Sequence, residues 1–244
     1  MNKSTTTKPK AAFGLLLVGP PKSGKTCFAL QFPNPYIIDC DNNLSGPHRY
    51  LSSKGSVPEY YYDVVDIDPV TQKEILPHNA WTRLTELAKK AVVSPEVDTI
   101  IIDSLSKVND YLVNHILHTE KQTNMRIQDW LPYNNLMKKF ITFLRSSGKL
   151  IILCAHETVI EDEMDKIPKY FVAMQSSLKY TIGGLFTDVW RAEFVPGSAG
   201  KDGTYSIRAI PTVRMSLGNS LGLPPVFPMD FVKEVAPKLN TLLT

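Results

Sequence analysis

The most specific chemistry in the sequence lies in eight consecutive residues near the N-terminus, Gly19-Pro20-Pro21-Lys22-Ser23-Gly24-Lys25-Thr26. They match the phosphate-binding pattern G-x-x-x-x-G-K-[ST] at every fixed position. Glycines let the backbone approach phosphate oxygens, the lysine supplies positive charge for the β- and γ-phosphates, and the final hydroxyl binds Mg²⁺. The segment therefore predicts a nucleoside triphosphate site, with Lys25 as its catalytic charge and Thr26 as a metal ligand.

A second oxygen ligand for the metal is expected from Asp103. This residue ends the run "TIIID", four apolar or β-branched residues followed by a carboxylate. Ligands of open α/β sheets lie at the carboxyl ends of such strands. We expect Asp103 to hold Mg²⁺ through water alongside Thr26, so ATP and Mg²⁺ are the expected substrate and cofactor. The alternative is that Asp103 caps the helix that begins near Leu105.

Hydrolysis also needs a group that orients or deprotonates water. Asp41 follows the strand-like run "PYIIDCD", and we expect it to be the catalytic carboxylate, with Glu157 as the next candidate. Asp39 shares the face of Asp41 but lies deeper in the predicted sheet. His156 ends another apolar run at the same rim, where its ring is a candidate sensor of the γ-phosphate.

The elements that would position these residues alternate along the chain. Apolar runs predict strands at residues 13–19, 35–41, 60–67, 97–104 and 149–156. Helical spacing, prolines and glycines predict helices at residues 24–32, 79–93, 105–119, 132–148 and 230–243, the last interrupted by Pro237. This alternation predicts an α/β fold with a mostly parallel central sheet flanked by helices. A Gly-rich turn between residues 188–195 and 204–210 predicts a C-terminal β-hairpin.

Composition limits the class of protein. The chain is 43% hydrophobic with a net charge of +3, as in an ordinary globular protein. We interpret residues 1–10 as a flexible N-terminal tail and residues 11–244 as a single domain. The polar, basic N-terminus shows no secretory signal pattern, and no apolar stretch approaches the roughly 18 residues of a membrane span. We therefore expect a cytoplasmic protein with no membrane partner.

The order of these motifs resembles the core of the RecA-type ATPases. The chain runs from the phosphate-binding loop through "YIIDCD", "TIIIDS" and "LIILCAHE" to a long loop and a hairpin. It is most similar to the short phage-encoded Sak-type single-strand recombination ATPases, over residues 12 to about 230. Relatives place a catalytic Glu where this chain has Asp41, at the end of Ile38-Asp39-Cys40-Asp41. The side chain here is one methylene shorter, which leaves the rate of hydrolysis open.

The resemblance implies an ATPase that binds single-stranded DNA, assembles as a ring or filament, and serves phage recombination or replication in the host cytoplasm. RecA-type proteins contact DNA through the loops after two of the sheet strands, here residues 107–132 and 157–182. The basic and aromatic candidates in them are Lys107, Arg126, Trp130, Lys169, Tyr170 and Lys179. RecA-type sites also lie between subunits, and we expect Arg214, with Arg208 second, to be the catalytic cation that a neighbour supplies.

Two other classes stay open from the residues alone. A phosphate-binding loop also occurs in kinases that act on a small molecule, with long loops as lid and acceptor site. It occurs as well in modules that bind a nucleotide, hardly hydrolyse it, and switch a protein partner. Turnover of ATP with and without single-stranded DNA separates the three.

Overall fold

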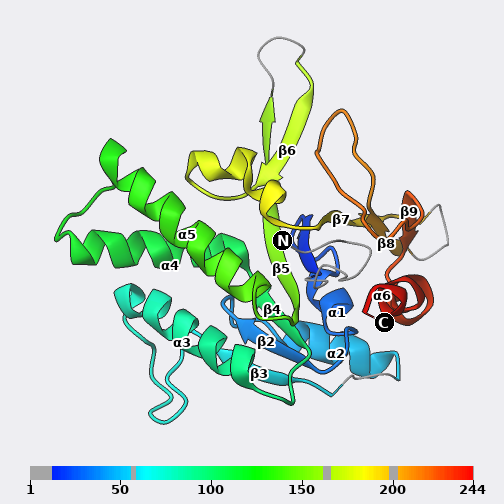
Figure 1. The fold of residues 1–244 in the computed structure, drawn as a ribbon, viewed down its shortest axis with the longest axis horizontal. Coiled ribbons are helices and arrows are strands. Elements are labelled where there is room, and N and C mark those ends of the chain that lie inside the picture. Colours follow the sequence, from blue (N-terminus) through cyan, green and yellow to red (C-terminus); the bar gives the residue numbers. More distant parts are fainter. Residues whose placement is uncertain (1–12, 56–58, 162–165, 198–202, 244) are drawn as a thin grey trace, which may run out of the picture.

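The computed structural model describes residues 13–55, 59–161, 166–197 and 203–243. The predicted tail, residues 1–10, lies outside these ranges, as does most of the Gly-rich turn. The described part forms one nine-stranded sheet with the strand order β3-β2-β4-β5-β1-β7-β8-β9, and β6 pairs with β5 beside it (Figure 1). The α/β fold with a mostly parallel sheet, expected from the alternation of elements, is confirmed.

Six neighbouring strands of the sheet are parallel. They are β3 (Tyr61–Val64), β2 (Pro35–Asp39), β4 (Thr99–Asp103), β5 (Leu150–Glu161), β1 (Gly14–Gly19) and β7 (Asp188–Val195). Their apolar runs are continuous because both faces of the sheet are covered. One face carries Leu16, Ile38 and Ile102, while Leu17, Ile37 and Ile101 point to the other. Each face builds its own hydrophobic core.

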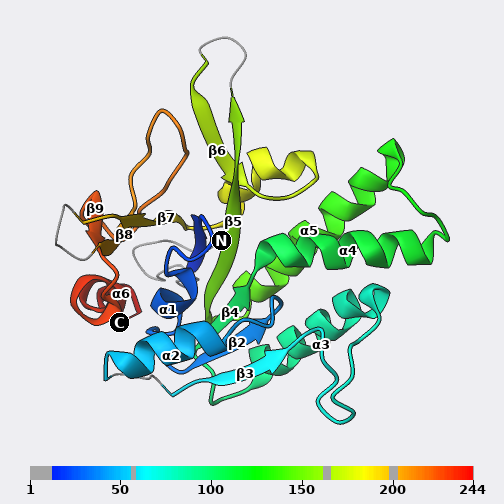
Figure 2. The same ribbon diagram turned by 180° about the vertical axis from the view of Figure 1, so that it is seen from behind.

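Helices cover the two faces as separate layers (Figures 1 and 2). The Leu17 face is covered by α1 (Lys25–Ala29), α2 (Ser45–Ser53) and α6 (Ala236–Leu243). The Leu16 face is covered by α3 (Ala80–Val93), α4 (Leu105–Thr119) and α5 (Trp130–Arg145). Short helical turns complete the connections: η1 (Pro77–Asn79), η2 (Ile127–Asp129), η3 (Ser177–Tyr180), η4 (Ile182–Leu185) and the π-helical η5 (Phe231–Val235).

Antiparallel strands extend the sheet at two places. The predicted C-terminal hairpin is present as β7 paired with β8 (Thr204–Arg208), and β9 (Val226–Pro228) adds a strand that the sequence did not suggest. The second half of β5 leaves the main sheet after His156 and forms another hairpin with β6 (Pro168–Val172). This hairpin projects above the sheet in Figure 1.

The two segments expected to be DNA-contacting loops are therefore mostly regular structure. Residues 107–119 continue α4, because apolar side chains recur there at helical spacing and pack on the sheet. The loop expected at residues 157–182 contains the end of β5, β6 and the turn η3. Both loop assignments were wrong in extent: residues 107–119 belong to the helix that the apolar spacing predicted, and residues 157–161 and 168–172 pair as strands.

Smaller differences follow from packing. The strand after α1, β2, does not pair with β1: β4 and β5 lie between them, because β1 already pairs with β5 and β7. Helix α1 ends at Ala29, four residues before Pro33. The C-terminal helix changes from π to α at Ala236 rather than breaking at Pro237, which occupies the first turn of α6, where a proline is tolerated. Among the described residues, no helix is long and apolar enough to cross a membrane.

Candidate nucleotide-binding site

The phosphate-binding loop joins β1 to α1 and is shaped by two glycines. A side chain at Gly19 would come within 2.4 Å of the carbonyl oxygen of Ala192 on β7, so the loop passes too close to β7 for any other residue. Gly24 has φ 87°, a left-handed conformation that costs glycine little. Gly24 is also the N-cap of α1 and offers no side-chain cap, so the first amides of that helix are available to a ligand.

Lys25 is buried within this loop. Its Nζ donates hydrogen bonds to the carbonyl oxygens of Gly19 at 3.0 Å and Pro20 at 2.8 Å. Burial lowers the pKa of Lys25, and the negative charge of nearby groups, Asp103 among them, acts in the opposite direction. The ammonium group is therefore held over the loop by carbonyl oxygens that a phosphate could replace.

Thr26 and Asp103 meet although they are 77 residues apart. The Thr26 hydroxyl donates to the Asp103 carboxylate with an Oγ1–Oδ2 distance of 2.5 Å. Burial raises the pKa of Asp103, while the hydrogen bond from Thr26 lowers it. The Asp103–Ser104 peptide bond is cis, and Ser104, not Asp103, caps α4 by accepting from the Lys107 amide. The alternative of Asp103 as helix cap is therefore wrong, and its carboxylate faces Thr26.

Sheet register brings the remaining candidates to the same edge. Asp39 on β2 lies opposite Asp103 on β4, which lies opposite Cys154 on β5, and Gly19 on β1 lies opposite His156 on β5. Because all four strands are parallel, their carboxyl ends share one edge of the sheet. The edge carries the phosphate-binding loop, two carboxylates and one imidazole.

Asp39 and Asp41 occupy different environments. Asp39 is buried and accepts from the amides of Asp41 and Asn43, each at 3.0 Å, so it fixes the loop after β2. Burial raises the pKa of Asp39 to about 6. Partial burial also acts to raise the pKa of Asp41, but His156 and Ser104 outweigh it and lower that pKa. An ionised Asp41 is suited to accept a hydrogen bond from water.

His156 lies between these acids and the phosphate-binding loop. Its Nε2 is 3.8 Å from Asp41 Oδ2, a contact longer than a hydrogen bond. Its amide donates to Ser106 Oγ at 3.0 Å, which holds the end of β5 against α4. The ring Nδ1 is buried without a partner among the described residues. The ring is positioned to respond to a group bound at this edge.

Glu157, the other carboxylate candidate, is already paired. Arg191 on β7 donates to both of its carboxylate oxygens, at 2.9 and 2.8 Å. Arg191 also pairs with Glu193, which pairs in turn with Arg208 at 2.9 Å. The network leaves Asp41 as the better placed group for water. The sequence did not predict this network, because its members come from three different strands. The only local signal is the alternation of charges along β7.

The residues present suit a nucleotide with a magnesium ion. Ser23 Oγ in the phosphate-binding loop is buried without a hydrogen-bond partner among the described residues, so this hydroxyl is available to form a hydrogen bond with a ligand. Hydroxyl and carboxylate oxygens such as those of Thr26 and Asp103 are the ligands that Mg²⁺ prefers. Lys25 and the loop residues 19–26 would hold the phosphates.

The DNA-binding candidates fall into two groups. Lys107 lies on α4, Arg126 pairs with Asp129 at 3.0 Å, and the Trp130 ring packs against the core of the Leu16 face. Lys169, Tyr170 and Lys179 instead line one concave surface on the β6 side of the sheet.

Arg214 lines that same concave surface. Its backbone carbonyl accepts from the Tyr170 amide at 2.8 Å, and its side chain is exposed. The role of Arg214 as a catalytic cation in a neighbouring site stays a prediction, as does that of Arg208, which here pairs with Glu193.

Replacing Asp103 with asparagine should weaken Mg²⁺-dependent nucleotide binding, because it removes one negatively charged oxygen ligand while keeping the side-chain volume. We expect the affinity for ATP in the presence of Mg²⁺ to fall roughly 10- to 100-fold and the affinity in its absence to change little. Calorimetric titration with and without the metal measures both. An equal loss in the two conditions would mean that Asp103 supports the loop rather than the metal.

Comparison with known proteins gives one family. A family model described as an AAA domain matches residues 12–206, which includes the phosphate-binding loop, Asp41, Asp103 and His156. No curated protein matches the chain.

Proposed function

Because the chain belongs to the AAA domain family, it is a nucleotide-binding P-loop ATPase, and we propose that it is an Mg²⁺-dependent enzyme that acts on single-stranded DNA. The observation that carries the proposal is the Thr26–Asp103 contact beside a buried Lys25, at the edge of the sheet where Asp41 and His156 also lie. Thr26 and Asp103 supply the metal ligands, and Asp41 supplies the acceptor for water.

Each residue has one task in this proposal. Lys25 neutralises charge on the β- and γ-phosphates of ATP. Asp41 accepts a hydrogen bond from the water that attacks the γ-phosphorus, and His156 holds the ionised Asp41 in place. Bound Mg²⁺ supplies further positive charge at the phosphates. Because the Asp41 side chain is shorter than that of the Glu in relatives, the loop after β2 must approach the γ-phosphate closely. Asp39 fixes that loop by accepting hydrogen bonds from two of its amides.

The hairpin β5–β6 supports the DNA part of the proposal. Strand β5 carries His156 at the nucleotide edge and continues into the hairpin, so one strand joins the two regions. Arg191 also joins them, since it pairs with Glu157 and its guanidinium lies 4.6 Å from the centre of the Tyr170 ring. A ligand that moves the hairpin would therefore shift groups beside the nucleotide, which is the basis for DNA-stimulated turnover.

The resemblance to Sak-type ATPases extends the proposal to assembly and setting. We propose a homo-oligomer, ring or filament, that serves phage recombination or replication in the bacterial cytoplasm. Turnover per subunit should then rise with protein concentration. A monomer with ATP and DNA present, with turnover independent of concentration, contradicts the shared site.

Single-stranded DNA should bind in preference to duplex, and salt should weaken binding steeply. Phosphate contacts release counterions, so the logarithm of the affinity falls linearly with the logarithm of the salt concentration. Fluorescence anisotropy of a labelled oligonucleotide, with a non-hydrolysable ATP analogue present, measures both properties. The absence of any binding at low salt would refute the DNA part of the proposal and leave the nucleotide part standing.

A further inference from the structure

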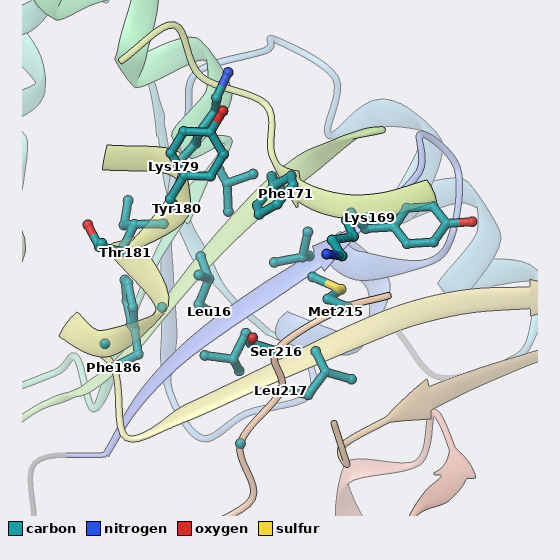
Figure 3. Close-up of a pocket in the computed structure, with 18 of the residues that line it drawn as sticks. Leu16, Lys169, Phe171, Lys179, Tyr180, Thr181, Phe186, Met215, Ser216 and Leu217 are labelled. Atoms are coloured by element: carbon teal, nitrogen blue, oxygen red, sulfur yellow. The ribbon is translucent and has the colours of Figure 1, made fainter. Parts of the chain in front are cut away.

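A concave surface of the described part lies beside β6, over the Leu16 face of the sheet. It is a groove of about 550 Å³ between β6, the turns η3 and η4, and residues 212–218, and we call it the β6 groove. Figure 3 shows Lys179 and Tyr180 on one wall, Met215, Ser216 and Leu217 on the opposite wall, and Leu16 of β1 between them. Four separate segments of the chain, β1 included, build it, so its shape is set by the fold.

The charge of the β6 groove departs from that of the whole chain. The sequence has 27 basic and 24 acidic residues, nearly balanced. The described residues that line the groove include the cations Lys179 and Arg214 but no aspartate or glutamate. A concave surface with cations and no carboxylate attracts an anion. The backbone amide of Arg214 donates to Thr212 Oγ1 and its backbone carbonyl accepts from the Tyr170 amide, so neither contact neutralises the guanidinium charge.

The walls and floor of the groove add a second property. Leu16, Val18 and Val189 form an apolar floor, and the Tyr180 ring is 56% exposed. The Phe171 ring meets Tyr180 edge to face at 5.0 Å, which orients the tyrosine, and the Lys179 ammonium lies 5.3 Å from the centre of its ring. An exposed aromatic face beside a cation suits a flat apolar group joined to a phosphate.

We propose that the β6 groove binds a segment of single-stranded nucleic acid, with phosphates at Lys179 and Arg214 and a base against Tyr180. Base faces are available only in an unpaired strand, because a duplex stacks them internally. The proposal rests on the proposed function and gives it a location. It also gives Arg214 a role within its own subunit, in place of the role in a neighbouring nucleotide site that its sequence position suggested.

The test compares two double variants that remove the same charge. Lys179→Gln with Arg214→Gln changes the groove, whereas Lys138→Gln with Lys139→Gln removes two exposed lysines on α5, outside the groove. For the groove variant we expect affinity for a labelled oligothymidylate to fall ~25-fold at about 0.1 M salt. The slope of log affinity against log salt concentration should fall by about 1.4, because each lost phosphate contact contributes about 0.7 to that slope. The affinity and the salt slope of the α5 variant should differ far less from those of the wild type. Equal effects in the two variants would overturn the proposal.

The base contact is tested separately. Tyr180→Leu should weaken binding of oligothymidylate by roughly 5- to 150-fold and leave binding of an abasic strand of equal length unchanged. Equal losses for both strands would show that Tyr180 supports the groove without stacking on a base. Competition by inorganic polyphosphate alone, with no preference for the strand, would assign the groove to a general polyanion and contradict the proposal.

Failure of this inference differs from failure of the proposed function. If the wild-type protein binds single strands and the groove variants bind equally well, DNA binding stands and lies elsewhere, with Lys107 and Arg126 as the next candidates. If the wild-type protein binds no single strand, the proposed function fails first. Mixing Arg214→Gln with Lys25→Ala protein separates the two roles of Arg214, because restored turnover requires a catalytic role across a subunit boundary and contradicts the groove role.

Discussion

Replacing Lys25 with alanine is expected to reduce ATP turnover by on the order of 10²–10³-fold or more. Lys25 is the buried cation of the phosphate-binding loop, held by the carbonyls of Gly19 and Pro20. Charge that develops on the phosphoryl oxygens during transfer then lacks its fixed counter-charge. Nucleotide affinity should fall as well, since the same charge acts on the bound ground state. Steady-state turnover and equilibrium titration measure the two losses separately.

The control for Lys25→Ala is Lys89→Ala. Lys89 is exposed on α3, far along the chain from the loop, and alanine is a good helix former. Turnover of the control should match that of the wild type. Thermal unfolding of both variants shows whether the fold is kept, and Lys25→Ala should fold, because the hydrophobic cores of both faces do not include Lys25. A folded Lys25→Ala protein with unchanged affinity and turnover would rule out the loop as the nucleotide site.

Replacing Asp41 with asparagine should separate binding from chemistry. Asparagine keeps the size of the side chain but loses the negative charge that accepts a hydrogen bond from water. We expect kcat to fall by roughly 10²–10⁴-fold, while the dissociation constant for ATP stays within a few-fold of wild type, since the group acts on the transition state. Rapid-mix turnover and nucleotide titration check the two halves of this statement.

Glu86→Gln is a matched control for Asp41→Asn, because Glu86 is an exposed carboxylate on α3 with the same charge. Its kcat should equal that of the wild type. If Asp41→Asn hydrolyses ATP normally, Glu157 becomes the next candidate for the catalytic carboxylate. Catalysis by Glu157 would require that Arg191 release the Glu157 carboxylate, so Arg191→Ala should then raise turnover.

Local patterns in the sequence predicted which polar residues meet at the carboxyl edge of the sheet. The phosphate-binding loop is contiguous, so its glycines and lysine are visible in eight residues. Asp103 and His156 each end an apolar run, and parallel strands that end in polar residues must bring those residues to one edge. The Thr26–Asp103 contact follows from that rule together with the phosphate-binding motif, which puts Thr26 at the start of the helix after β1.

The same reasoning did not predict contacts between strands that are far apart in the sequence. The pairing of Glu157 with Arg191 depends on β7 lying beside β1, which no local pattern reveals. The strand β6 was hidden because its residues, "PKYFV", follow an acidic segment and alternate only briefly. Arg214 could be placed after the hairpin but not against Tyr170, since residues 209–225 form an irregular connection whose path is set by tertiary packing.

The central claim is that ATP turnover at the edge of the sheet responds to single-stranded DNA. The direct test measures the steady-state rate of phosphate release with Mg²⁺, across a titration of an unstructured oligonucleotide. We expect the rate to rise with the strand and to saturate, and duplex of the same length to have a smaller effect. Transfer of phosphate to a small acceptor, at a rate independent of DNA, would indicate a kinase. Tight ATP binding with no turnover in either condition would contradict the account and indicate a nucleotide-controlled switch.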